Sequence, residues 1–161
     1  MRPNRKQRAL VHLSLLVSLL LTLIPWPNTL QLLMPQWTAM VIAYWSLHDQ
    51  NRSVMSLAFF YGLMLDILMG GLLGKHGMAL VALSFLVLKS AKQLRMTSFW
   101  QLLLMVLVLL FNDLIIRLFI DWLSYSYLPK WQDFLPLLSV VFIWPWLHYL
   151  LNRLNGYLRH H

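Results

Sequence analysis

Three ionisable residues interrupt long apolar runs of this sequence, where a charge is unfavourable. Asp66 lies in one run, and Asp113 and Arg117 lie four residues apart in another. Burying such a charge in hydrocarbon costs about 3 kcal/mol on insertion scales, so each side chain should face protein or water and have a partner. Asp113 and Arg117 can pair along one helix, and we expect Arg117 to bridge to Asp66 as well. A proton or ion pathway is the alternative use of these charges.

Small residues recur every fourth position around the first of these carboxylates. The row comprises Ala58, Gly62, Asp66, Gly70 and Gly74, and five of the six glycines of the chain lie in this region. Because positions four apart share one helix face, the row predicts a narrow groove with a carboxylate in its middle. Small residues let two helix backbones approach closely, which is how helices associate in lipid. The groove either packs within the chain or receives a partner helix or a second copy of the chain.

Patterns typical of enzymes and metal sites are missing from the sequence. The chain has no cysteine, and its six histidines show no metal-ligand spacing apart from the terminal pair. The run from Gly70 to His76 resembles a phosphate-binding loop but lacks its spacing, its hydroxyl residue and a preceding strand. We therefore expect no catalytic residue, cofactor or metal, and we expect His76 to lie on the outer surface.

The composition indicates that lipid is the main solvent of this chain. Of its 161 residues, 60% are hydrophobic and 11% are charged, whereas roughly 25% are charged in ordinary globular proteins. Five acidic and thirteen basic residues cannot cover a soluble domain of this size. The net charge of +8 is interpreted as basic loops that face anionic lipid headgroups, and not as a nucleic-acid surface.

The hydrophobic runs predict an all-α membrane protein with one polytopic domain over residues 1–161. Continuous apolar runs exclude a spanning barrel, which needs alternating residues, so each segment should be a helix. The second segment is the weakest, because Gln31, Pro35 and Gln36 dilute its start, and five spans are the alternative to six. The expected helices cover residues 9–24, 30–47, 53–73, 77–90, 99–123 and 134–154.

Basic residues give the expected orientation in the membrane. With six spans and a cytoplasmic N-terminus, ten of the thirteen Lys and Arg residues fall on the cytoplasmic side and two fall outside. With five spans, the basic cluster over 89–95 would fall outside and weaken this bias. Both termini are therefore expected in the cytoplasm, and the first segment is interpreted as an uncleaved helix instead of a signal peptide.

Tryptophans lie where the membrane interfaces are expected. Trp100 and Trp122 bracket the fifth segment and are 22 residues apart, which is about 33 Å along a helix. Trp26 and Trp37 flank the break between the first two segments. An aromatic belt accounts for these positions, and an aromatic ligand cage is the alternative.

The run from Gly62 to Gly74 resembles the central G-x-x-x-D-x-x-x-G-x-x-L-G signature of the MreD family of rod shape-determining proteins. Its length, its span count and several aromatic elements agree with the proteobacterial members of that family. These elements are Pro25-Trp26-Pro27, Pro35-Gln36-Trp37, Tyr44-Trp45 and Trp144-Pro145-Trp146.

The resemblance implies a component of the cell-elongation machinery without catalytic residues. Members of the family bind the bitopic membrane protein MreC. With MreC they link MreB filaments to the lateral-wall peptidoglycan synthases, a polymerase of the RodA type and its penicillin-binding partner. The resemblance also implies a six-helix fold like that of the membrane substrate-binding subunits of energy-coupling-factor transporters.

Two functional hypotheses follow, and each makes a different structural demand. In the first, the groove over 58–74 or the adjacent face of the fifth segment receives the membrane helix of MreC. In the second, the chain is a small-molecule binding or transport subunit in which Asp66, Asn112, Asp113 and Arg117 converge on a sealed cavity. An enzyme acting on lipid-linked precursors is a third, weaker reading, because a carboxylate pair is a common structural feature.

Overall fold

The computed structural model describes residues 5–25, 27, 33–48, 53–96, 98–126 and 128–160. Within these residues the chain forms six α-helices and one short 3-10 helix, and no strand. Arg2, Trp26 and Arg52, which the orientation and interface predictions used, lie outside the described residues. The elements are α1 (Arg5–Leu23), α3 (Trp37–His48), α4 (Ser53–Met69), α5 (Lys75–Met96), α6 (Phe99–Tyr125), η1 (Trp131–Phe134) and α7 (Leu135–His160).

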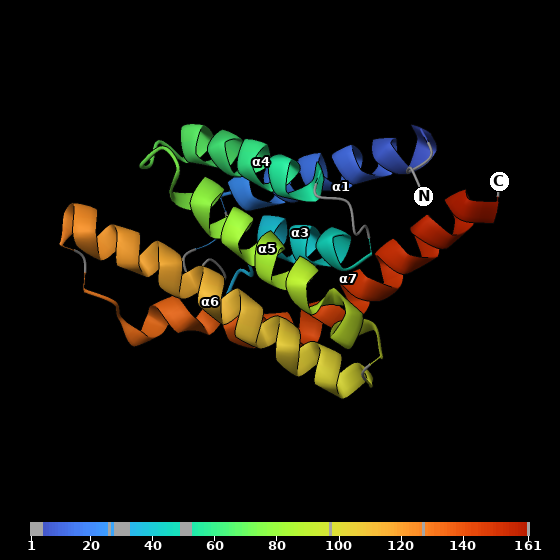
Figure 1. Cartoon of the computed structure of the whole chain (residues 1–161). Coiled ribbons are helices and arrows are strands. Elements are labelled where there is room, and N and C mark those ends of the chain that lie inside the picture. Colours follow the sequence, from blue (N-terminus) through green and yellow to red (C-terminus); the bar gives the residue numbers. More distant parts are fainter. Residues whose placement is uncertain are drawn as a thin grey trace.

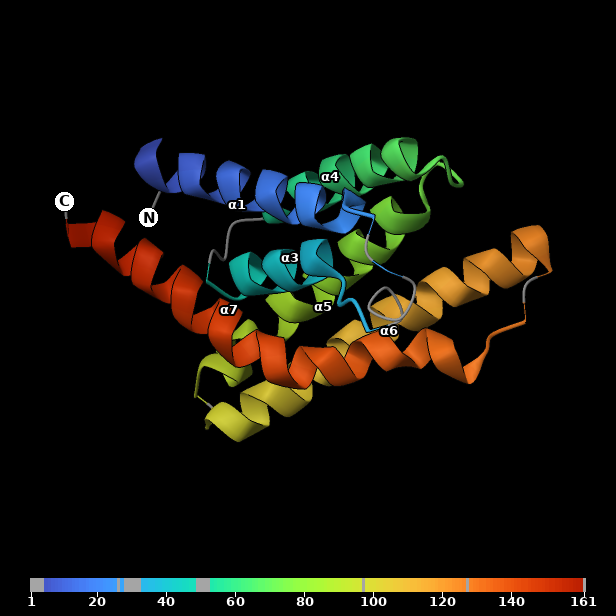
Figure 2. The same cartoon turned by 180° about the vertical axis from the view of Figure 1, so that it is seen from behind.

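The helices are arranged in three layers, which Figures 1 and 2 show from opposite sides. Helices α1 and α4 form one layer, α3 and α5 the middle one, and α6 and α7 the third. The most extensive contact joins α4 and α5, which are consecutive and antiparallel, whereas α6 and α7 touch over a much shorter stretch. Both chain ends lie at the same end of the molecule (Figure 1).

Helix α3 forms the centre of the core. Every residue from Thr38 to Leu47 is buried, and Tyr44 and Trp45 are among the largest fully enclosed side chains. Trp144 of α7 reaches the same core and is also fully buried. With 12 residues, α3 is about 18 Å long, less than the roughly 30 Å of a hydrocarbon core. It is therefore a buried helix enclosed by its neighbours.

The expected second helix over 30–47 is shorter than predicted. It begins at Trp37, directly after Pro35 and Gln36, and its first turn is closed by the Met40 N–H, which donates to the Gln36 carbonyl at 3.0 Å. Proline disfavours helical backbone in the residue before it, which explains why the helix does not extend further back. Residues 30–32 of the expected helix lie outside the described part of the chain.

Among the described residues, three stretches are long and apolar enough to cross a membrane. They are Lys6–Leu23, Phe99–Tyr125 and Trp131–Tyr157. Helix α4 is apolar but shorter, with 17 residues. An all-helical chain with three apolar candidate spans is thus confirmed within the described residues, while the number of six spans stays a prediction. Helices α6 and α7, predicted over 99–123 and 134–154, extend further, to Tyr125 and His160.

Candidate functional site

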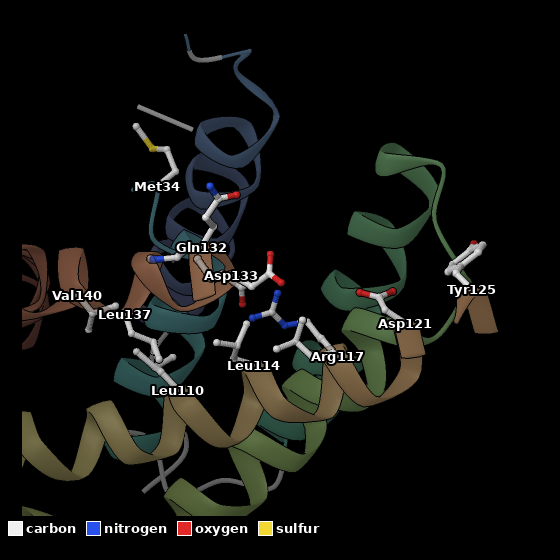
Figure 3. A pocket seen from close by; sticks show the side chains of 13 residues that line it. Met34, Leu110, Leu114, Arg117, Asp121, Tyr125, Gln132, Asp133, Leu137 and Val140 are labelled. Atoms are coloured by element: carbon white, nitrogen blue, oxygen red, sulfur yellow. The ribbon is translucent and has the colours of Figure 1, made fainter. Parts of the chain in front are cut away.

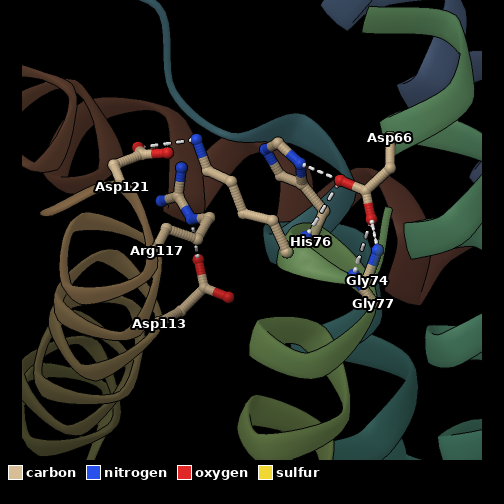
Figure 4. Close-up of polar contacts among 8 residues, drawn as sticks. Asp66, Gly74, His76, Gly77, Asp113, Arg117 and Asp121 are labelled. Carbon is tan, nitrogen blue, oxygen red and sulfur yellow. Dashed lines mark hydrogen bonds and ion pairs between the residues drawn. The ribbon is translucent and has the colours of Figure 1, made fainter. Parts of the chain in front are cut away.

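Asp66 of α4 caps the beginning of α5 (Figure 4). Its carboxylate accepts backbone N–H bonds from Gly74 at 2.8 Å, His76 at 3.1 Å and Gly77 at 3.5 Å. In addition, the Nδ1 atom of His76 lies 2.7 Å from Asp66 Oδ1. The first N–H groups of a helix have no partner within it and carry partial positive charge. Asp66, which is only 1% exposed, is therefore satisfied by Gly74 and the first residues of α5.

A left-handed glycine, Gly70, ends α4 one turn after Asp66. Gly70 has φ +63 and donates its N–H to the Ile67 carbonyl at 3.3 Å, and Gly71 donates to the Asp66 carbonyl at 3.1 Å. These two bonds form a Schellman motif, which satisfies the last carbonyls of a helix and favours glycine at the left-handed position. The helix expected over 53–73 consequently stops before Gly70 instead of continuing.

The small-residue face closes against the chain's own α5. A Cβ atom on Gly62 would lie 2.5 Å from the Cα atom of Gly77, so the two backbones are in contact at this point. Ala58 is fully buried on the same side. Gly70 and Gly74 have positive φ and lie in the turn, so the prediction of one five-residue helix face is wrong. The helical part of the row, which includes Ala58 and Gly62, packs against α5 of the same chain.

Arg117 has one of its two expected partners. Its Nε atom lies 3.1 Å from Oδ2 of Asp113, which confirms the predicted pair along α6. The expected bridge from Arg117 to Asp66 is wrong, because Asp66 is occupied by the beginning of α5. The donors to Asp66 are backbone N–H groups only 8 to 11 residues away in the chain, in and just after the turn that follows α4. They occupy the carboxylate in place of a side chain from α6.

The first turn of α5 contributes two polar side chains that the sequence did not assign to a cluster. Lys75 Nζ lies 2.6 Å from Asp121 Oδ2 on α6. The side chain of His76 is only 12% exposed and contacts Asp66, so its expected place on the outer surface is wrong. The signal that could have placed both residues is their position just after Gly74, at a helix N-terminus that needs an anion.

A cleft of about 550 Å³ opens between α6 and the start of α7 (Figure 3). One of its ends is polar, with Arg117, Asp121 and Asp133, and the rest is mostly apolar. The loop before α3 and the 3-10 helix η1 contribute amide side chains to the rim. The full lining is Met34, Gln36, Leu110, Leu114, Arg117, Leu118, Asp121, Tyr125, Gln132, Asp133, Pro136, Leu137 and Val140.

The polar set expected around a sealed ligand cavity does not converge. Of its four members, Arg117 alone lines the cleft. Asp66 is the cap of α5, Asn112 is exposed on α6, and Asp113 is buried beneath Arg117. Across the described residues, no group of three or more His, Cys, Asp or Glu side chains is placed to hold a metal ion.

A second face of α6 carries a regular stripe of exposed apolar side chains. They are spaced three or four residues apart, the pattern of a helix seam that packs against another helix. At about 100° per residue, the stripe is turned roughly a third of a circle away from the cleft-lining face. The stripe comprises Leu104, Val108, Phe111, Ile115, Phe119 and Trp122.

Comparison with known proteins gives one consistent result. The family model for rod shape-determining protein MreD matches residues 4–154. A curated relative, the Rod shape-determining protein MreD of Haemophilus influenzae (strain ATCC 51907 / DSM 11121 / KW20 / Rd), is 27% identical over 145 residues and covers 90% of each chain. No solved structure matches the chain. The matched region includes both the α4–α5 hairpin and the cleft.

Proposed function

The chain belongs to the family of the rod shape-determining protein MreD, and we propose that it is an integral-membrane scaffold of the cell-elongation machinery. The observation that carries this proposal is the family match over residues 4–154. The family determines cell shape and does not consist of enzymes. In the proposed role the protein binds MreC and helps couple MreB filaments to lateral-wall peptidoglycan synthesis.

The proposed location is the bacterial inner membrane, with both termini in the cytoplasm. Two features support this orientation. The N- and C-termini lie at the same end of the molecule, and the excess of Lys and Arg falls on that side when six segments are threaded. Reporter fusions at the C-terminus and in the 70–74 turn test the orientation, because the two positions should report opposite sides.

For the MreC contact we propose the exposed stripe of α6. The original candidate, the groove over 58–74, is covered at Gly62 by α5, which leaves the adjacent face of the fifth predicted segment. Helix α6 has 27 residues and is long enough to span a bilayer with some tilt. A partner helix could therefore follow the stripe over its whole depth, and a second copy of the chain is the competing occupant.

Cysteine cross-linking tests this contact directly, because the chain contains no cysteine of its own. Ile115→Cys and Phe119→Cys, on the stripe, are each paired with MreC that carries one cysteine in its membrane helix. We expect oxidative cross-links from both positions, in a pattern that shifts by one turn between them. Phe142→Cys, which is 81% exposed on α7, is the matched control and should give none.

Two results would contradict different parts of this proposal. If MreC does not co-purify with the unmodified protein in mild detergent, the scaffold function itself is wrong. If MreC co-purifies but cross-links from Phe142→Cys and not from the stripe, the function holds and the site is wrong. Cross-links between two copies of the chain from the stripe would assign that face to self-association.

A small-molecule binding subunit of the energy-coupling-factor type is the second candidate function. The volume of the cleft, about 550 Å³, favours it, since small-molecule sites commonly occupy about 300–1,000 Å³. The missing convergence of the expected polar set counts against it. Mass spectrometry of small molecules released from purified protein tests this alternative, and a stoichiometric water-soluble compound would support it.

A further inference from the structure

We propose that a small cavity between the α4–α5 hairpin and α3 binds one water molecule, which joins His76 to Thr38 and makes this joint sensitive to protonation of His76. The cavity has a volume of about 30 Å³. A single water molecule needs about 10–15 Å³ and two to four polar partners, whereas small-molecule sites are at least about ten times larger than this cavity. The polar side chains that line it are those of Thr22, Gln36, Thr38 and His76.

Thr38 at the beginning of α3 supplies the first sign that the cavity holds a polar ligand. The residue is 2% exposed and lines the cavity. Its Oγ1 atom has no hydrogen-bond partner among the residues that the structure describes. Leaving a buried hydroxyl unpaired is unfavourable, and ordered water is the usual partner of buried polar groups that no protein atom reaches. A water molecule in the cavity would therefore satisfy Thr38.

His76 contributes a hydrogen-bond acceptor to the same cavity. Its Nδ1 atom lies 2.7 Å from Asp66 Oδ1, and an ionised carboxylate accepts hydrogen bonds but cannot donate them. The hydrogen of a neutral His76 is therefore assigned to Nδ1, which leaves a lone pair on Nε2. Figure 4 shows this second ring nitrogen pointing away from Asp66. A hydrogen of the cavity water is the donor that it requires.

Donors and acceptors around the cavity balance for one water molecule when His76 is neutral. Thr22 donates its hydroxyl hydrogen to the Ser18 carbonyl at 2.8 Å, so it can only accept on the cavity side. The water would donate one hydrogen to Nε2 of His76 and the other to Thr22, and it would accept the hydroxyl hydrogen of Thr38. Gln36 can add one more bond, because its amide both donates and accepts.

Protonation of His76 disturbs this balance. Nε2 would then donate, so the water would have to accept from it, and the hydroxyl hydrogen of Thr38 would need another acceptor. The new charge would also lie near two cations, Arg117 of α6 and Lys75 of α5, while Asp66 of α4 would attract it. The residues that line the cavity from α1, from α3 and from the loop before α3 are uncharged.

The net effect on His76, which precedes the apolar segment expected over 77–90, favours the neutral ring. Burial, and after it the charge of Arg117, lower the pKa of His76 against the opposing effect of Asp66. The folded chain therefore binds this proton less readily than the unfolded chain. Stability should be lost as the pH falls from about 6.5, the ordinary histidine value, toward the lower pKa of the folded state.

A double-mutant cycle between Thr38→Val and His76→Asn tests the water bridge. Valine keeps the shape of threonine without the hydroxyl, and asparagine keeps an N–H for Asp66 without an atom in the place of Nε2. The unfolding equilibrium constant of the full-length protein in mild detergent is measured by titration with a denaturing detergent at about pH 7.5, above the ordinary histidine pKa. We expect Thr38→Val to destabilise the protein, with a coupling of about fivefold between the two substitutions, the factor of one hydrogen bond.

The sign of the Thr38→Val effect separates a bridged hydroxyl from an unpartnered one. Removal of an unpartnered buried hydroxyl leaves stability unchanged or raises it, and either result would overturn the proposal. Additive effects of Thr38→Val and His76→Asn would overturn it as well. The matched control combines Thr38→Val with His12→Asn, because His12 contacts Tyr61 at 3.1 Å and does not line the cavity. The effects of this pair should add.

A pH profile of the same variants tests the protonation of His76. Between about pH 7.5 and about pH 5.5, one histidine can raise the unfolding equilibrium constant by at most about tenfold. We expect a rise within this limit in the unmodified protein and in His12→Asn, and a smaller rise in His76→Asn. An equal rise in all three proteins would overturn the claim that the joint responds to protonation of His76.

Discussion

The α4–α5 hairpin and the α6–α7 pair join consecutive helices in opposite ways. In the hairpin, the backbones of α4 and α5 touch at Gly62 and Gly77. The buried carboxylate of Asp66 accepts the first backbone N–H groups of α5. In the α6–α7 pair, the helices leave a cleft of about 550 Å³ with charged side chains at one end. The motif that is most conspicuous in the sequence therefore forms a close contact between two helix backbones, whereas the less conspicuous region leaves charged side chains along a cleft.

The largest effect is expected at the backbone contact of the hairpin. Gly62→Leu places a side chain where even a Cβ would lie 2.5 Å from Gly77 Cα, so α4 and α5 must separate. We expect loss of most folded protein, because overpacking typically costs about 1–3 kcal/mol, and here two helix backbones must move apart to admit the side chain. Fluorescence-detected size-exclusion chromatography of membrane extracts measures the folded fraction.

Gly71→Ala is the matched control for this variant. It lies in the same hairpin, but nothing is within 4 Å of the added Cβ, and its folded yield should equal that of the unmodified chain. A monodisperse Gly62→Leu protein at normal yield would show that the close contact between α4 and α5 is dispensable.

A smaller effect is expected when the carboxylate that caps α5 loses its charge. Asp66→Asn keeps the shape but weakens the charge-assisted bonds from the Gly74 and His76 N–H groups. We expect destabilisation by about 2 kcal/mol, from the range for hydrogen bonds to charged groups. A thermal unfolding series in detergent measures the shift of the midpoint, and hydrogen exchange should increase first at the beginning of α5.

Retention of exchange protection at the beginning of α5 in Asp66→Asn would count against the capping role. If the midpoint falls but the exchange increases uniformly, Asp66 contributes to global stability without a specific action on α5.

The smallest effect is expected at the ion pair on the cleft side. Asp121→Asn removes the partner of Lys75, whose side chain is 19% exposed. Ion pairs that retain access to solvent contribute at most about 1 kcal/mol, so the unfolding midpoint should move less than in Asp66→Asn. The same thermal series compares the two variants. A larger loss in Asp121→Asn than in Asp66→Asn would show that the ion pair between α5 and α6 contributes more to stability than the cap of α5.

The all-helical character of the chain was predictable because it follows from local apolar composition. The pair of Asp113 and Arg117 was predictable for a related reason, since a spacing of four residues fixes their relative position on any α-helix. The end of α4 was not identified, although Gly70 and Gly71 supplied the signal. A run of glycines every four residues is compatible both with a packing face and with a helix stop, and the bonds that distinguish them come from the turn itself.

The sequence was sufficient to establish an apolar, helical, lipid-solvated chain and its one pair of opposite charges along a helix, because composition and spacing act within a single segment. The burial of α3 and the cleft beside Arg117 depended instead on how separate helices are rotated and shifted against one another. Those rotations arise from contacts between residues that are distant in the chain, such as Gly62 with Gly77 and Lys75 with Asp121. No local pattern encodes such contacts, so the three-dimensional packing had to supply them.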